Sequence, residues 1–193
     1  MNYTKVDSVS LETNQNQDTF IQMLGDEHLA RIAQFNSNND ELNDFLRKDA
    51  LSYQKLHIGT TYLLLRKSDS KPLAYITLSM SALKLPEKKE EFTLAGRRLG
   101  EYPKDFPNQL PALLLGKLAT DQSEEGKGAA SQLLDFAVYL ALAQRESIGC
   151  AFLVAHAYAT PKVVGWYERK RFMRIVRDIE GRETVPLYLE LGV

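Results

Sequence analysis

The chain contains a single cysteine, Cys150, among 193 residues. This count excludes an internal disulfide and any metal site built from several cysteines. Histidine is also scarce, because only His28, His57 and His156 are present, in unrelated segments without the spacing of metal ligands. We therefore expect no metal centre, and we interpret each histidine as a structural or an exposed side chain.

Long apolar runs are missing as well. The longest one compatible with a helix, residues 136–143, is far shorter than the roughly 20 residues that span a bilayer. The first ten residues, MNYTKVDSVS, are polar and do not resemble a signal peptide. These features predict a soluble cytoplasmic protein that has no membrane partner.

The net charge is only −1, which argues against broad, charge-driven binding to nucleic acid. Charge is nevertheless unevenly distributed, since residues 161–182 carry seven basic side chains against three acidic ones. The basic residues are Lys162, Arg169, Lys170, Arg171, Arg174, Arg177 and Arg182. Such a patch can contact several phosphates or can be a solvated helix face, and the sequence leaves both interpretations open.

A hydrophobic content of 44% over this length suits one well-buried domain. We expect a loose N-terminal segment over residues 1–25 and the domain over residues 26–193. Periodicity, capping residues and turn residues predict the elements within it. They are a strand at 28–35, a helix at 40–55, strands at 60–67 and 73–81, a polar interruption at 83–110, a strand at 113–119, a helix at 128–145, a strand at 151–156, a helix at 161–170, and strands at 172–177 and 185–191. This order predicts a single α/β domain with a mixed central sheet flanked by helices.

The most informative segment is residues 113–131, LLLGKLATDQSEEGKGAAS. A buried strand breaks there into an acidic turn, and a long helix follows. Gly126 and Gly128 allow the backbone to bend around an anion, to which the helix would present unpaired N–H groups. Neither GxxxxGK[ST] nor GxGxxG is present at this turn. From the residues alone, a phosphate site and a plain glycine-containing turn remain equal alternatives.

The turn resembles the acetyl-CoA pyrophosphate loop of the GCN5-related N-acetyltransferases, [RQ]-x-x-G-x-[GA]. It matches at Gly128 and Ala130, and Glu125 stands where the family has a cationic or amide side chain. The blocks FNSNNDELNDFLRKDA (35–50), LP…YP…LPALLLGKLATD (85–121) and VVGWYERKRF (163–172) resemble one subgroup, the acetyltransferase toxins of bacterial toxin–antitoxin pairs.

This resemblance implies that acetyl-CoA, as cosubstrate, lies along the backbone of Leu118, Ala119 and Thr120, and that the N–H near Leu118 stabilises the oxyanion. It places the pyrophosphate on the N–H groups of Glu125, Gly126, Lys127, Gly128, Ala129, Ala130 and Ser131. Tyr167 matches the family tyrosine that protonates the departing thiolate. Arg171 stands where the family has glycine, so either Arg171 adopts a left-handed conformation at some cost or the helix ends differently.

The resemblance further implies that the acceptor is the α-amine of aminoacyl-tRNA, that a ribbon-helix-helix antitoxin is a partner, and that the protein forms a homodimer. Two alternatives remain open: an acetyltransferase of a small amine or protein N-terminus, and a non-catalytic CoA-binding domain. No general base is evident, which favours an α-amine of pKa near 7.7–8.0 over a lysine amine near 10.4. Tyr75, Glu101 and Asp105 are the candidate helpers.

Overall fold

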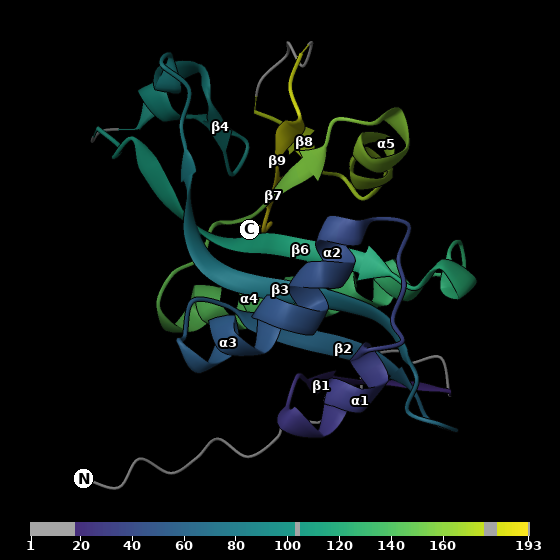
Figure 1. Cartoon of the computed structure of the whole chain (residues 1–193). Helices are drawn as coiled ribbons and strands as arrows, with labels where there is room; N and C mark the ends of the chain where they lie inside the picture. The colour runs from purple at the N-terminus through teal and green to yellow at the C-terminus, as the bar shows by residue number, and fades with distance from the viewer. Residues whose placement is uncertain (1–17, 103–104, 176–180, 193) are drawn as a thin grey trace, which may run out of the picture.

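The computed structural model describes residues 18–102, 105–175 and 181–192. A seven-stranded sheet forms its centre, with the strand order β1-β2-β3-β6-β7-β9-β8 (Figure 1). In that order the strands are Thr19–Met23, Thr60–Arg66, Pro72–Lys84, Gln109–Thr120, Phe152–Tyr158, Thr184–Glu190 and Met173–Arg174. Neighbouring strands are antiparallel except β6 and β7, which are parallel. The predicted mixed sheet of an α/β domain is confirmed.

One face of the sheet is covered by the N-terminal helices. The predicted helix at 40–55 is present as α2 (Asp40–Asp44), a π-helical turn, η2 (Phe45–Asp49), and α3 (Ala50–Lys55). Asn39 caps it, since its side chain accepts a hydrogen bond from the backbone N–H of Leu42. The apolar face packs on the sheet in a cluster that includes Phe45, Leu46 and Tyr75.

The strand expected at 28–35 is wrong, because this segment forms the 3-10 turn η1 (Asp26–His28) and the short helix α1 (Leu29–Ile32). Ile32 and Phe35 are both buried, and their separation by three residues suits a helical turn better than a strand. The first strand is instead β1, which pairs with β2. Residues 19–23, expected within the N-terminal segment, form this strand, and residues 1–17 fall outside the described part.

The opposite face carries α4 (Ala129–Ser147) and α5 (Pro161–Arg169). Thr160 caps α5 by accepting a hydrogen bond from the N–H of Val163, and Pro161 occupies the first turn, where its missing N–H costs nothing. Both helices pack into one apolar cluster with the inner strands. Among the described helices, none has the length and apolar character needed to cross a membrane.

The polar interruption at 83–110 is an arm that projects from the outer ends of β3 and β6 (Figure 1). It contains η3 (Lys89–Glu91), the small hairpin of β4 (Thr93–Leu94) and β5 (Arg97–Arg98), and η4 (Leu99–Glu101). Phe92 of the arm packs against Phe152 and Tyr188, with ring centroids 6.0 and 5.4 Å away. The arm thus has its own apolar contact with the sheet.

Candidate functional site

Strands β6 and β7 separate partway along the sheet. They pair from Ala112 with Phe152 to Leu115 with Ala155, and no pair follows although β6 continues to Thr120 and β7 to Tyr158. On its other side β6 stays paired with β3 as far as Thr120. The edge of β6 that faces β7 therefore presents backbone groups without a strand partner over its last residues.

The register of β6 shows which backbone groups face this gap. The N–H of Asp121 donates to the carbonyl of Leu73, so residues 121 and 73 stand at a hydrogen-bonded position of the antiparallel pair. Because hydrogen-bonded and non-bonded positions alternate, Ala119 directs its N–H and C=O toward β3, whereas Leu118 and Thr120 direct theirs toward β7. Leu118 and Thr120 are therefore available to a ligand in the gap, and Ala119 is not.

A bulge marks the position at which the strands separate. In the pairing of β6 with β3, Leu115 lies opposite Leu78 and Lys117 opposite Thr77, so that Gly116 has no opposite residue. A bulge of this kind bends its strand and increases the local twist. The bend in β6 lies directly after the last residue that pairs with β7.

The gap ends at the turn between β6 and α4. Gly126 and Gly128 have φ of 76° and 90°, in the left-handed region that favours glycine, and Gly128 is the N-cap of α4. A Cβ atom added at either glycine would meet nothing within 4 Å. The first N–H groups of a 19-residue helix thus begin beside open space, an arrangement that fits an anion such as a pyrophosphate.

Glu125 connects this turn to two other segments. Its carboxylate accepts hydrogen bonds from the Asn38 side chain at 2.7 Å and from Lys162 Nζ at 3.1 Å. The ammonium of Lys162 lowers the pKa of Glu125, with a smaller effect from Asn38. The negative charge that replaces the family's cationic or amide side chain is therefore paired with a cation from α5.

Tyr167 lies on α5, and its ring contacts those of Trp166 and Phe172 at centroid distances of 4.9 and 5.1 Å. The residue is 7% exposed, and burial raises its pKa, which keeps the phenol protonated. Its hydroxyl makes no hydrogen bond with the described residues, yet no fully buried side-chain oxygen or nitrogen among them lacks a partner. The hydroxyl therefore keeps some contact with solvent and is free to donate a proton to a ligand.

The end of α5 is a left-handed turn at Arg171, whose φ is 67°. The N–H of Phe172 donates to the carbonyl of Tyr167, and the N–H of Arg171 donates to that of Glu168. These two bonds and the contact between the rings of Tyr167 and Phe172 define a Schellman motif, in which glycine is the usual residue at the Arg171 position. Of the two alternatives for this position, the structure therefore has the left-handed conformation of Arg171.

The structure brings most of the predicted site residues together. Leu118 and Thr120 lie at the gap, and the turn and first helical residues from Glu125 to Ser131 follow at the same end of β6. Lys127 is paired with Glu124 at 3.5 Å. Tyr167 packs in the same apolar cluster as Leu118 and Ala129.

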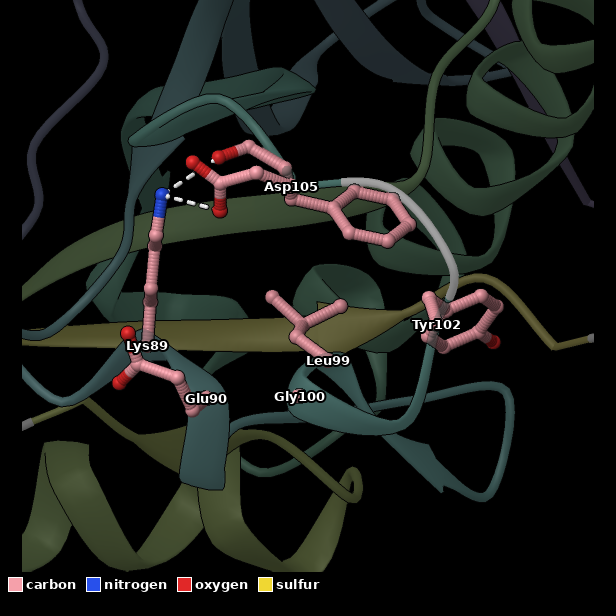
Figure 2. A pocket seen from close by; sticks show the side chains of 7 residues that line it. Lys89, Glu90, Leu99, Gly100, Tyr102 and Asp105 are labelled. Atoms are coloured by element: carbon pink, nitrogen blue, oxygen red, sulfur yellow. Dashed lines mark hydrogen bonds and ion pairs between the residues drawn. The ribbon is translucent and has the colours of Figure 1, made fainter.

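The three candidate helpers are all bonded to other groups of the protein. Tyr75 is fully buried, donates its hydroxyl hydrogen bond to the carbonyl of Leu42, and has a pKa raised by burial. Glu101 and Asp105 belong to the arm, where they pair with Arg97 and Lys89. Figure 2 shows Lys89 directed toward Asp105, beside a cavity of about 180 Å³ inside the arm. Glu101 and Asp105 therefore lie away from the gap, whereas the Tyr75 hydroxyl is within electrostatic reach of Tyr158 and Glu41 but is already bonded to Leu42.

Sequence reasoning missed one cluster at the gap. Glu41 of α2 accepts hydrogen bonds from Lys117 of β6 at 2.5 Å and from Tyr158 of β7 at 2.8 Å. These partners are 76 and 117 positions away in the chain, so no local pattern identifies them. The carboxylate bridges the two strands where they no longer bond to each other.

Comparison with known proteins finds a relative that is named as an acetylating toxin, and similar solved structures. No protein-family model matches the chain. A curated relative, the tRNA-acetylating toxin of Mycobacterium tuberculosis, is 26% identical over 161 residues, which cover 83% of this chain and 84% of the relative. A solved structure of a KacT mutant has a TM-score of 0.73 at 23% identity, covering 91% of this chain and 96% of that one. AtaT complexed with acetyl-methionyl-tRNAfMet has a TM-score of 0.71 at 24% identity, covering 90% and 95%. The chain therefore has the fold of the GCN5-related N-acetyltransferases and, within that fold, is similar to the acetyltransferase toxins of toxin–antitoxin pairs.

Proposed function

We propose that this protein transfers the acetyl group of acetyl-CoA to the α-amine of an aminoacyl-tRNA. The observation that carries the proposal is the gap between β6 and β7, which runs into an open glycine turn at a helix N-terminus. The curated relative is named a tRNA-acetylating toxin, and related AtaT structures hold acetyl-CoA or acetylated methionyl-tRNA. When bound, acetyl-CoA supplies the thioester whose acetyl group is transferred.

The backbone of β6 would hold the cosubstrate in the gap. An extended pantetheine chain can bond to the free N–H and C=O groups of Leu118 and Thr120 as an added strand would. The N–H of Leu118 would also stabilise the negative charge that develops on the carbonyl oxygen as the amine attacks. At the turn, the N–H groups from Glu125 to Ser131 would bind the pyrophosphate, with Gly126 and Gly128 leaving room for it.

Tyr167 would act as the general acid. Its phenol is kept neutral by burial, and its hydroxyl has no competing partner among the described residues, so it can donate its proton to the sulfur that leaves. The Schellman turn at Arg171 fixes the backbone of Tyr167 through the bond from Phe172 N–H to the Tyr167 carbonyl. The end of α5 therefore orients the proposed acid.

The basic segment offers a surface for tRNA phosphates. Lys162 and Arg174 are paired with Glu125 and Glu168. Arg169, Lys170 and Arg171, by contrast, have no side-chain hydrogen bond or ion pair within the described chain. Three unpaired cations at one helix end favour phosphate contact over a merely solvated face. Arg177 lies outside the described residues.

We further propose that the protein acts in the cytoplasm, where charged tRNA is found, that it forms a homodimer, and that a ribbon-helix-helix antitoxin neutralises it. Support for an antitoxin comes from AtaT, which has been solved with its antitoxin AtaR, and a KacTA complex has been solved on DNA. Co-purification with the product of a neighbouring small gene, followed by measurement of the complex mass, tests these partners.

The function is tested by incubating the protein with labelled acetyl-CoA and charged bulk tRNA, with uncharged tRNA as a control. Label should enter charged tRNA only, and Tyr167→Phe should lower turnover by about 10²–10⁴-fold. Tyr139→Phe is a matched control, since Tyr139 is exposed on α4. Label that enters only small amines or protein N-termini would refute the tRNA acceptor. Binding of acetyl-CoA without turnover of any amine would refute the activity itself.

A further inference from the structure

His156 is exposed although it lies in a central strand. Strand β7 is flanked by β6 and β9, and all four of its residues before His156 are buried, as is Ala157 after it. The last pair between β6 and β7 joins Leu115 to Ala155. His156 is therefore the first residue of β7 beyond the point where the strands separate, at the inner end of the gap.

The imidazole lies on the face opposite α4 and α5. Ala155 and Ala157 pack in the apolar cluster of those two helices, and successive side chains of a strand alternate between faces. His156 therefore shares the other face with Tyr158, whose hydroxyl meets Glu41 of α2. An acceptor that approaches the gap from the α2 face would meet His156, while α5 provides Tyr167 from the opposite face.

Glu41 is not available to take up a proton on this face. Its carboxylate holds both Lys117 and Tyr158, and the hydrogen bond from Lys117 is the main reason that its pKa is lowered. The bridge ties the first turn of α2 to both strands and so positions the α2 side of the gap. The imidazole of His156, in contrast, makes no hydrogen bond or ion pair with any described residue.

We propose that His156 is the general base for the acceptor amine, an inference that rests on the proposed function. As the amine nitrogen bonds to the thioester carbonyl carbon, one of its N–H protons passes to the imidazole, and the C–S bond breaks with protonation of the sulfur by Tyr167. The imidazolium then loses its proton to solvent, from which Tyr167 is reprotonated. Imidazole is the side chain suited to this exchange near neutral pH.

Within residues 18–102, 105–175 and 181–192, few other charged groups face His156. Tyr158 follows on its own strand, Lys117 comes from β6 and Glu41 from α2. On β9 the residue opposite His156 is Pro186, which does not titrate. On β8, Arg174 is held by Glu168 on the side of α5. If kcat depends on pH in wild-type protein and this dependence is lost when the imidazole is removed, the dependence is therefore assignable to His156.

The test compares His156→Gln and His156→Ala with wild-type protein at saturating acetyl-CoA and charged tRNA, between pH 6 and 9. His57→Asn is the matched control, because His57 is exposed at the end of α3 and its φ of 57° suits asparagine. We expect kcat at pH 7 to fall about 10²-fold in both His156 variants, the lower end of general-base effects. Added imidazole should restore part of the activity of His156→Ala, and the stabilisation by acetyl-CoA should be unchanged.

Normal kcat in both His156 variants would overturn the inference and leave the proposed function intact. The inference would also be overturned if the His156 variants changed only the KM for charged tRNA and if this change became smaller as salt was added. His156 would then be a phosphate contact. A wild-type protein that acetylates no charged tRNA would instead overturn the proposed function, and the base assignment with it.

Discussion

Replacing Arg171 by glycine should stabilise the protein. Arg171 occupies the left-handed position of the Schellman turn, with φ of 67°, and its side chain forms no hydrogen bond or ion pair with the described residues. The left-handed conformation costs an ordinary L-residue roughly 1–2 kcal/mol. Glycine avoids this cost but loses about 0.5–1 kcal/mol more in chain entropy on folding. The expected net gain is about 0.5–1 kcal/mol in the free energy of unfolding.

The measurement is thermal and denaturant unfolding of Arg171→Gly beside Lys170→Gly. Lys170 is the neighbouring C-cap with φ of −91°, so glycine there relieves no strain and adds only flexibility. For a chain of this size, Arg171→Gly should raise Tm by about 1–4 °C, whereas Lys170→Gly should leave it unchanged or lower it. Both variants remove one positive charge, so an effect of charge alone would be similar in the two.

Equal changes in the two variants, or a loss of stability in Arg171→Gly, would refute this reasoning. It would mean that the Arg171 side chain stabilises the fold by more than its backbone conformation costs. Tyr167 should keep its place in Arg171→Gly, because the bond from Phe172 N–H to the Tyr167 carbonyl does not involve the side chain at 171. Turnover per molecule at saturating substrates should therefore change little.

Three other perturbations test the turn and its surroundings. Acetyl-CoA at one hundred times its Kd should stabilise wild-type protein by about 2.7 kcal/mol. Gly128→Glu should abolish the corresponding Tm shift, because it strains a φ of 90° and adds a carboxylate at the anion site. An undiminished Tm shift in this variant would place the cofactor elsewhere. Glu125→Gln removes a negative charge and releases Lys162, so calorimetry should show a lower Kd for acetyl-CoA. This gain in affinity should fall as the salt concentration increases. An unchanged Kd at low salt would contradict the prediction. Burial raises the pKa of Asp121, but hydrogen bonds from Ser123 and the Asn36 N–H outweigh it and lower the pKa overall. The ionised Asp121 therefore contributes fully to the free energy of unfolding above the pKa of about 3.9 that it has in the unfolded chain. This contribution is lost as pH falls through the lower pKa of the folded protein. Urea unfolding between pH 2 and 5 should show a shallower pH dependence for Asp121→Asn than for wild type, and identical slopes would contradict the assignment.

Local features of the chain were sufficient to predict much of the site. The apolar run of β6, the two glycines and the long helix after them are neighbours in sequence, so strand, turn and helix follow from periodicity and glycine geometry. Tyr167 could be placed on α5 because Thr160 and Pro161 mark the start of that helix. The strained backbone of Arg171 was predictable too, because a helix end constrains φ through bonds within one turn.

Only the tertiary structure decided how the strands meet. Apolar patterning does not show which segment pairs with β2, so it predicts a strand at 28–35 and does not identify β1. The separation of β6 from β7 depends on the pairing register between distant segments and on the bulge at Gly116. The residues next to His156 in the sequence therefore do not predict that its side chain is exposed. The Glu41 bridge joins side chains 76 and 117 positions apart. Local sequence determines conformation over a few residues, whereas the positions of charges across the gap depend on the packing of the whole sheet.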